Sequence, residues 1–266
     1  MTNADPVRVL VFTGGPEIQP DVLDFVGRLE KETGTELAAI FCETATPGLR
    51  GTLSDLWRRR RLLALPLLVQ RGVRIVRDEI FHRRRAAARR SIARQIKGRL
   101  HYVTDLHSAA VLSRVNSIGA DLGLVYGGPI LREELYEIPR LGTLGIHHGL
   151  TPGYRGKKTT FWAMYNGEKH VGVTIQKIGS GLDRGDVAAE ARLPVGRAPI
   201  PVISARLERR GIDLYMQAIK DVSTGTVKYR PQPEGPGVLY RDPSFTEIMR
   251  FWGRYLIRVV KPPKTR

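Results

Sequence analysis

Cysteine is nearly absent from this sequence, since Cys42 is the single thiol among 266 residues. One thiol excludes an internal disulfide framework and a zinc site built from cysteines, and it suits a reducing compartment. The sequence also lacks any apolar run of about 18 to 20 residues, the length that a membrane-spanning helix requires. Met1 to Pro6 are short and polar and do not resemble a signal peptide. We therefore expect a soluble, cytoplasmic protein.

Acidic residues are scarce, with 26 Asp and Glu against 43 Lys and Arg, which gives a formal net charge of +17. This balance favours anionic partners such as a nucleotide-linked substrate, RNA or a membrane surface with acidic lipids. The alternative is a basic surface in an organism that prefers arginine, because net charge alone does not identify a ligand.

Arginine is concentrated in residues 52–99, which include an unbroken run at 58–61. The composition predicts two or three basic helices inserted into the fold. These helices either form solvated faces or attach the protein peripherally to an anionic membrane, at the inner face. Co-sedimentation with anionic but not neutral vesicles would separate these two interpretations.

The N-terminal region has the pattern of an α/β protein. Residues 7–13 predict an apolar strand, 21–33 an amphipathic helix and 36–42 a second strand, with Gly14 and Gly15 after the first strand. Strand, glycine loop, helix and strand open a doubly wound, mostly parallel twisted sheet. The glycine pair is not a complete dinucleotide fingerprint, so we expect no nicotinamide cofactor. A tight turn that requires glycine explains the pair equally well.

Residues 142–187 carry the chemistry. Two strand ends each present one titratable side chain, His147 and Asp183, inside glycine-rich loops. A neutral imidazole beside a carboxylate can move a proton near neutral pH. His148 and Asp186 add further groups, but no third ligand has the spacing of a metal site, so no metal is predicted.

Four motifs in this stretch resemble those of the 10-formyltetrahydrofolate-dependent formyltransferases, which act on methionyl-tRNA, glycinamide ribonucleotide or nucleotide sugars. They are H-x-G-L-x-P-x-Y-R-G at 147–156, W-A-x-x-N-G-E at 162–168, G-V-T at 172–174 and G-L-D-x-G-D at 181–186. The resemblance implies a Rossmann-like formyltransferase domain over residues 7–200. Residues 52–99 would be its basic helical insertion and 201–266 a short C-terminal helical extension.

The resemblance implies an Asn, His and Asp catalytic set, of which this chain has His147 and Asp183 but Gly145 in place of the Asn. Formyl transfer to an amine develops an oxyanion, and removing one hydrogen-bond donor to it costs about a hundred- to a thousand-fold in rate. The loss of the Asn side chain also predicts open space beside His147, which a bulkier acceptor could use.

The resemblance also implies binding residues. The expected folate contacts begin at the last residue of the strand at 121–126, and two more lie in the glycine-rich loops. They are Tyr126, Gly127, Gly128, Pro129, Ile130, Leu131, Pro152 and Gly181. The expected acceptor contacts are Gly14, Gly15, His148, Tyr154, Arg155 and Gln176. A strand-to-helix turn packed by apolar side chains is the alternative explanation of 126–131.

The sequence therefore predicts an enzyme that transfers a formyl group from 10-formyltetrahydrofolate to an amine. The expected amine is an amino sugar carried by a nucleotide or another anionic group. The alternatives are a catalytically impaired folate- or nucleotide-binding paralogue and a deformylase-like hydrolase. The segment after Asp221 is too short for an anticodon-arm-binding barrel, so initiator tRNA is not expected as the acceptor. For residues 245–260 three roles are expected: they pack on the domain, they pair two copies in a homodimer, or they lie at a membrane.

Overall fold

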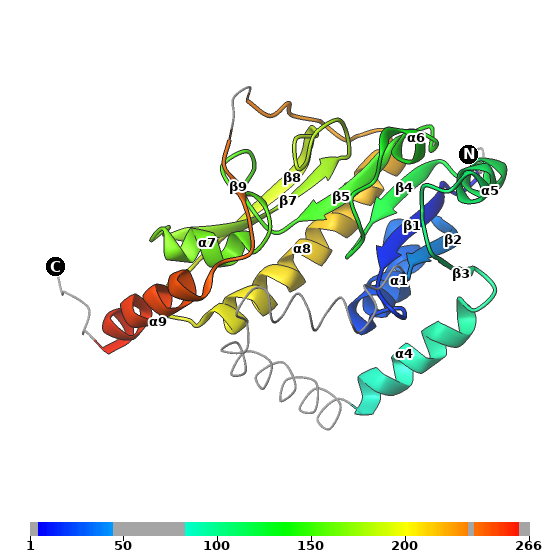
Figure 1. Ribbon diagram of the computed structural model, residues 1–266. Coiled ribbons are helices and arrows are strands. Elements are labelled where there is room, and N and C mark those ends of the chain that lie inside the picture. The colour runs from blue at the N-terminus through cyan, green and yellow to red at the C-terminus, as the bar shows by residue number, and fades with distance from the viewer. Residues whose placement is uncertain (1–4, 45–82, 234–236, 261–266) are drawn as a thin grey trace.

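The computed structural model describes residues 5–44, 83–233 and 237–260. Its centre is a seven-stranded sheet with the order β3-β2-β1-β4-β5-β7-β8 (Figure 1). The first five strands in this order pair in parallel. The next strand, β7, is antiparallel to β5, and β8 is antiparallel to β7. The strands are β1 (Arg8–Gly14), β2 (Glu36–Glu43), β3 (Leu100–Val103), β4 (Leu122–Val125), β5 (Thr143–His147), β7 (His170–Lys177) and β8 (Val187–Pro194).

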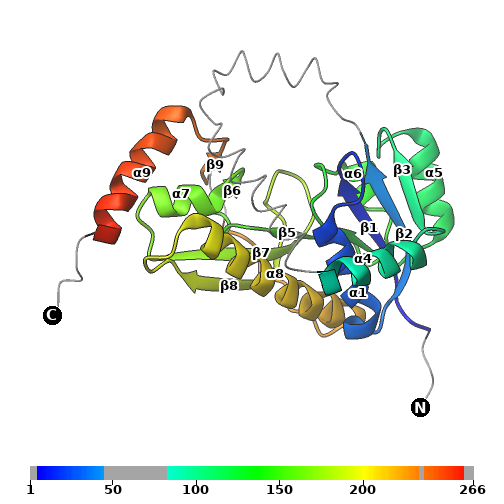
Figure 2. The same cartoon turned by 90° about the horizontal axis from the view of Figure 1, so that it is seen from below.

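Helices cover both faces of the sheet. On one face α1 (Pro20–Thr33) and α8 (Ile200–Ser223) lie side by side, and α4 (Arg83–Gln95) packs on α1 (Figure 2). The other face carries α5 (Ala109–Ile118) and the short α6 (Glu133–Tyr136). The remaining elements lie toward the β7–β8 end: α7 (Thr159–Tyr165), α9 (Phe245–Val260) and a small sheet of β6 (Arg155–Gly156) and β9 (Leu239–Tyr240).

Strand β1 shows why both faces are covered. Val9 and Val11 belong to the core beneath α1 and α8, whereas Leu10 and Phe12 belong to the core beneath α5 and α6. Successive side chains of a strand point to opposite faces, so a continuous apolar strand must be buried on both sides. The predicted α/β, Rossmann-like fold with a mostly parallel sheet is confirmed.

The C-terminal extension and the arginine-rich insertion predicted from the sequence both contribute helices to the face that carries α1. Helix α8 lies in the predicted C-terminal extension, yet it packs on β7 and β8 and contributes Tyr215 and Ile219 to the largest core. Of the arginine-rich insertion, residues 52–82 lie outside the described residues. The described part contains α4, whose Arg89 donates two hydrogen bonds, of 2.9 and 2.6 Å, to the carboxylate of Asp24 on α1.

Within the described ranges, no helix combines the length and the apolar character needed to cross a membrane. Contact with an anionic membrane and pairing into a homodimer stay predictions. The carboxyl ends of the parallel strands β1, β4 and β5 meet at one edge of the sheet, where ligands bind in folds of this type. The loops that follow these strands therefore lie together.

Candidate active site

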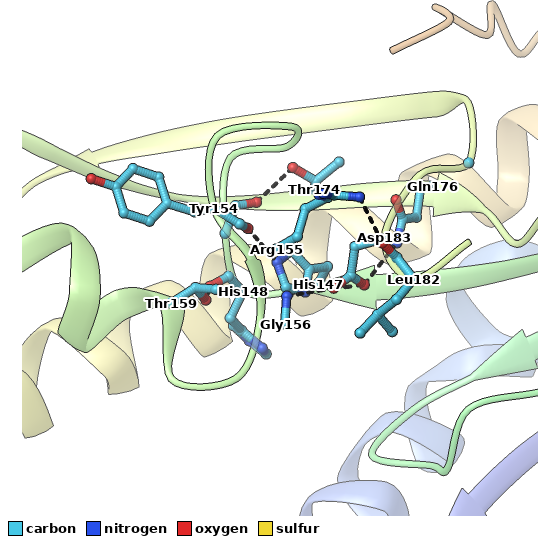
Figure 3. A network of polar contacts seen from close by, with 12 residues as sticks. His147, His148, Tyr154, Arg155, Gly156, Thr159, Thr174, Gln176, Leu182 and Asp183 are labelled. Atoms are coloured by element: carbon cyan, nitrogen blue, oxygen red, sulfur yellow. Dashed lines mark hydrogen bonds and ion pairs between the residues drawn. The ribbon is translucent and has the colours of Figure 1, made fainter. Parts of the chain in front are cut away.

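The structure brings His147 and Asp183 together. His147 is the last residue of β5, and its Nδ1 atom lies 3.4 Å from Oδ1 of Asp183, which follows the neighbouring strand β7 (Figure 3). Asp183 has a φ of 53°, in the left-handed region that most side chains avoid, and Gly181 before it has a φ of 89°. The glycine-rich loop thus turns sharply and directs the carboxylate back toward β5.

Two hydrogen-bond donors fix the Asp183 carboxylate. Its Oδ2 atom accepts a 2.8 Å hydrogen bond from the backbone N–H of Gly156, and its Oδ1 atom accepts a 3.2 Å bond from Nε2 of Gln176. Gly156 itself has a φ of 87°, and a Cβ atom there would lie 2.4 Å from the carbonyl oxygen of Tyr240. Glycine is therefore required for the backbone approach that orients the carboxylate.

His147 has both ring nitrogens engaged within the protein. Its Nε2 lies 2.7 Å from the carbonyl oxygen of Tyr154, and because a carbonyl only accepts, Nε2 carries the proton. Burial lowers the pKa of His147, and nearby His148 lowers it further, while the Asp183 charge and the Tyr154 hydrogen bond oppose them. The imidazole is therefore neutral near pH 7, with the Nδ1 lone pair turned toward the carboxylate.

A pocket of about 440 Å³ opens beside Asp183. Val125, Gly145 and Gln176, from three adjacent strands, contribute to its floor. One wall is the segment 128–133 together with Tyr136, and the other is the loop 178–185. The volume lies within the range of about 300 to 1,000 Å³ that is typical of small-molecule sites.

The predicted folate contacts divide into two groups. The pocket is lined by Gly128, Pro129, Ile130, Leu131 and Gly181. Its lining does not include the other three, Tyr126, Gly127 and Pro152.

Tyr126 lies on the opposite face of the sheet, because its neighbour Val125 faces the pocket and side chains alternate along the chain. Its ring stacks on Phe25 with centroids 4.7 Å apart, and its hydroxyl donates a hydrogen bond to Glu208. The sequence analysis predicted that all of 126–131 contact the folate. Because side chains alternate between the two faces, the Tyr126 side chain does not reach the pocket.

The predicted acceptor contacts also divide. Gln176 lines the pocket, but Arg155 is buried and its guanidinium faces the carbonyl oxygens of Leu182 and Gly237, at 3.5 and 3.4 Å. Tyr154 stacks on Tyr240, with ring centroids 5.1 Å apart. Arg155 and Tyr154 therefore hold loops together around the site.

His148, Gly14 and Gly15 do not line this pocket either. His148 is directed away from Asp183 (Figure 3), and its Nε2 lies 2.8 Å from Oε2 of Glu208 on α8. Gly14 packs behind the pocket wall, where a Cβ atom would lie 3.3 Å from Cδ of Pro129.

The open space expected beside His147 is filled in part by Ile178. A Cβ atom at Gly145 would lie 2.6 Å from Cδ1 of Ile178, so the end of the Ile178 side chain would have to shift to admit an Asn there, although Gly145 itself lines the pocket. The sequence offers no means of knowing which side chain covers a glycine.

Two residues of the site were missed. Gln232 donates from Nε2 to Oε1 of Gln176 at 3.1 Å and to the carbonyl oxygen of Gly185 at 2.7 Å. His107, after β3, accepts a 3.0 Å hydrogen bond on Nε2 from the backbone N–H of Arg132 and so fixes the pocket wall. His107 also lies within 4.8 Å of Glu43 and Asp105 through their ligand atoms. Neither residue belongs to a sequence motif, and the absence of a metal stays a prediction.

Comparison with known proteins connects this geometry to a family. A sequence model of formyl transferases matches residues 73–219. The methionyl-tRNA formyltransferase of Synechocystis sp. is 34% identical over 125 residues, 46% of this chain and 38% of the relative. That of Halorhodospira halophila is 27% identical over 233 residues, 87% of this chain and 64% of the relative. The chain thus spans less than two thirds of the length of these relatives.

Solved structures share the fold. The phosphoribosylglycinamide formyltransferase of Coxiella burnetii superposes with a TM-score of 0.59 at 15% identity, covering 89% of this chain and all of that one. A protein of Mycobacterium tuberculosis, for which sugar N-formyl transfer is inferred, superposes with a TM-score of 0.56 at 14% identity. That comparison covers 98% of this chain and 90% of the other.

Proposed function

This chain belongs to the formyl transferase family, and we propose that it transfers a formyl group from 10-formyltetrahydrofolate to an amine. The observation that carries the proposal is the pair of the buried His147 with Asp183, whose carboxylate lines a pocket of about 440 Å³. A coupled imidazole and carboxylate can take a proton from one substrate and return it to another.

The pocket suits the pterin of a folate in its chemistry. Ile130, Leu131 and Ile178 offer apolar surface for the bicyclic ring of a reduced pterin, and the glycine-rich loop 178–185 offers backbone donors and acceptors for its polar edge. Arg132 and Arg184 also line the pocket and provide positive charge for the carboxylates of a folate tail.

In the proposed reaction the amine nitrogen bonds to the formyl carbon, the bond from that carbon to N10 breaks, and a proton passes from the amine to N10. Asp183 is the group that lines the pocket and accepts the amine proton. The neutral His147, 3.4 Å away, shares that proton through Nδ1 while Tyr154 holds its other nitrogen. The reaction changes no oxidation state, and every atom and proton is accounted for.

As the acceptor we propose an amino sugar carried by a nucleotide or another anionic group. The formal charge of +17 supports an anionic acceptor, and the fold shared with the M. tuberculosis protein supports an amino sugar. Methionyl-tRNA is the rival acceptor, because the relatives from Synechocystis sp. and Halorhodospira halophila are named methionyl-tRNA formyltransferases. Gly145, in place of a side-chain donor, favours an impaired folate-binding paralogue as the rival function.

The test is to incubate the purified protein with 10-formyltetrahydrofolate and a panel of amines: nucleotide-linked amino sugars, glycinamide ribonucleotide and methionyl-tRNA. Release of tetrahydrofolate that depends on an amine supports transfer and identifies the acceptor. Release without an amine indicates a hydrolase. Binding of the donor without any turnover indicates the impaired paralogue, and absence of donor binding rejects the proposal.

A further inference from the structure

The floor of the pocket contains a carboxamide on the strand next to Gly145. In the antiparallel register of β5 and β7, Gly145 is directly opposite Gln176. Directly opposed residues point to the same face of a sheet, with Cβ positions about 4.5 to 5.5 Å apart. The amide that position 145 lacks is therefore available one strand away, on the same face and in the same pocket lining.

Gln176 is fixed in orientation. Its side chain is buried, with 3% of the residue exposed, and its Nε2 donates to Oδ1 of Asp183 at 3.2 Å. Its Oε1 accepts from Nε2 of Gln232 at 3.1 Å. Because Gln232 supplies a donor, the oxygen of Gln176 must face it, and the NH₂ group must face Asp183.

Gln232 is itself anchored. Its Nε2 lies 2.7 Å from the carbonyl oxygen of Gly185 and 3.1 Å from that of Asp183. Both carbonyls belong to the loop that forms one wall of the pocket. Gln232 therefore ties the amide of Gln176 to the same loop that positions the Asp183 carboxylate.

His147 is not placed to supply the missing donor. Its Nε2–H is used by the carbonyl oxygen of Tyr154, and its Nδ1 faces Asp183. Ile178 covers the position where an amide on β5 would lie. The NH₂ group of Gln176 has two hydrogens and donates one to Asp183. Among the residues that the structure describes no other group accepts from it, so the second hydrogen is available beside the reacting groups.

We propose that Gln176 is the donor that stabilises the oxyanion in place of a side chain at position 145, and that Gln232 is a positioning residue that holds it. The inference rests on the proposed formyl transfer. As the amine bonds to the formyl carbon, the C=O electron pair moves onto the oxygen, where the free N–H of Gln176 meets it. The pair returns when the C–N10 bond breaks, and Gln176 neither gains nor loses a proton.

The first test is Gln176→Leu, which keeps a side chain of similar volume and removes the amide. We expect kcat to fall about a hundred- to a thousand-fold, the usual effect of removing one oxyanion donor, with KM for the donor substrate changed less than about threefold. Gln232→Leu should lower kcat by a smaller factor, about tenfold, because it releases the amide without deleting it. Gln217→Leu is the matched control, since Gln217 is an exposed amide bonded to Asp221.

The second test returns the amide to β5. Adding Gly145→Asn and Ile178→Ala to Gln176→Leu removes the side chain that covers position 145 and restores a donor there. We expect the triple variant to recover kcat at least tenfold over Gln176→Leu. A triple variant that folds and binds the donor substrate without any gain contradicts the proposed exchange of roles.

The third test does not depend on turnover. Infrared difference spectra with the ¹³C-formyl donor, bound without an amine, should show a lower formyl carbonyl frequency in the wild type than in Gln176→Leu. Equal frequencies, or an unchanged kcat in Gln176→Leu, overturn the inference. Failure of the wild type to transfer formyl to any amine rejects the proposed function, while the infrared comparison still decides whether Gln176 donates to the formyl oxygen.

Discussion

His147 and His148 are adjacent in the sequence and lie on opposite faces of the sheet, because side chains alternate at the end of β5. Each faces a carboxylate. His147 pairs with Asp183 at 3.4 Å on the pocket face, and His148 pairs with Glu208 at 2.8 Å on the α8 face. The two pairs have the same chemistry, so their different surroundings are what distinguishes them.

The pocket pair is much less exposed than the other. The side chains of His147 and Asp183 are 9% and 13% exposed, against 35% and 37% for His148 and Glu208. At His147 the cost of burying a charge exceeds the attraction of the carboxylate, so burial lowers the pKa even beside Asp183. A close carboxylate is therefore not sufficient to make a histidine cationic, and we propose that the His147–Asp183 pair transfers the proton.

Replacing each carboxylate gives the largest expected contrast. In Asp183→Asn the amide cannot accept the amine proton, so we expect kcat to fall about a hundred- to ten-thousand-fold. The matched variant Glu208→Gln acts on the pair at the α8 face and should change kcat less than about tenfold. Steady-state kinetics with the identified amine measure both. Equal losses in the two variants would show that the α8 face takes part in the chemistry.

Tyr126→Phe tests the structural role of the α8 face. The Tyr126 hydroxyl is buried and donates to Glu208, and burial together with that carboxylate raises its pKa well above the usual value. Deleting the hydroxyl removes a hydrogen bond to a charged group, so we expect the free energy of unfolding to fall by about 1.5 to 3 kcal/mol. The ring stack on Phe25 remains, so kcat should change less than threefold. Urea unfolding measures the first effect, and a large loss of kcat with unchanged stability would contradict it.

Sequence patterns predict much of this fold. The strands and helices of the N-terminal half follow from apolar runs between glycine and proline, because strands buried on both faces need such runs. The motif at 147–156 and the loop at 181–186 predicted that His147 and Asp183 lie close together, and the structure places their side chains 3.4 Å apart. Strand β8 was not predicted, since AAEAR within it has no clear strand period.

The contacts that set the chemistry could not be predicted. The filling of position 145 by Ile178 depends on the register of β5 against β7, which no local pattern encodes. Gln232 reaches Gln176 across 56 residues from a proline-rich segment. The position of Tyr126 depends on which face of β4 the pocket occupies. Each is a property of tertiary packing.

The dependence of stability on pH tests the burial of His147. Burial lowers the pKa of His147 in the folded state, so the unfolded chain, with a histidine pKa of about 6.5, binds the proton more readily. Stability then rises with pH across this window and is lost as pH falls below about 6.5, by at most about 1.4 kcal/mol per pH unit. Urea unfolding at pH 7.5 and 5.5 should show a smaller loss in His147→Gln than in the wild type. A loss of equal size in the two proteins would contradict the assignment to His147.

The smallest expected effect tests the contact that covers position 145. In Gly145→Ala the new Cβ atom meets Cδ1 of Ile178 at 2.6 Å, so Ile178 must shift, at a cost of about 1 kcal/mol or more for overpacking. Ile178→Val deletes that Cδ1 atom. In this background Gly145→Ala should cost nothing, because alanine is favoured over glycine in a strand interior by roughly 0.5 to 1 kcal/mol. A double-mutant cycle of unfolding free energies should therefore show a coupling of about 1 kcal/mol, as expected for residues in contact. Additive effects would mean that Ile178 does not occupy the space beside Gly145, and an amide restored at 145 would then reach the pocket without any change at 178.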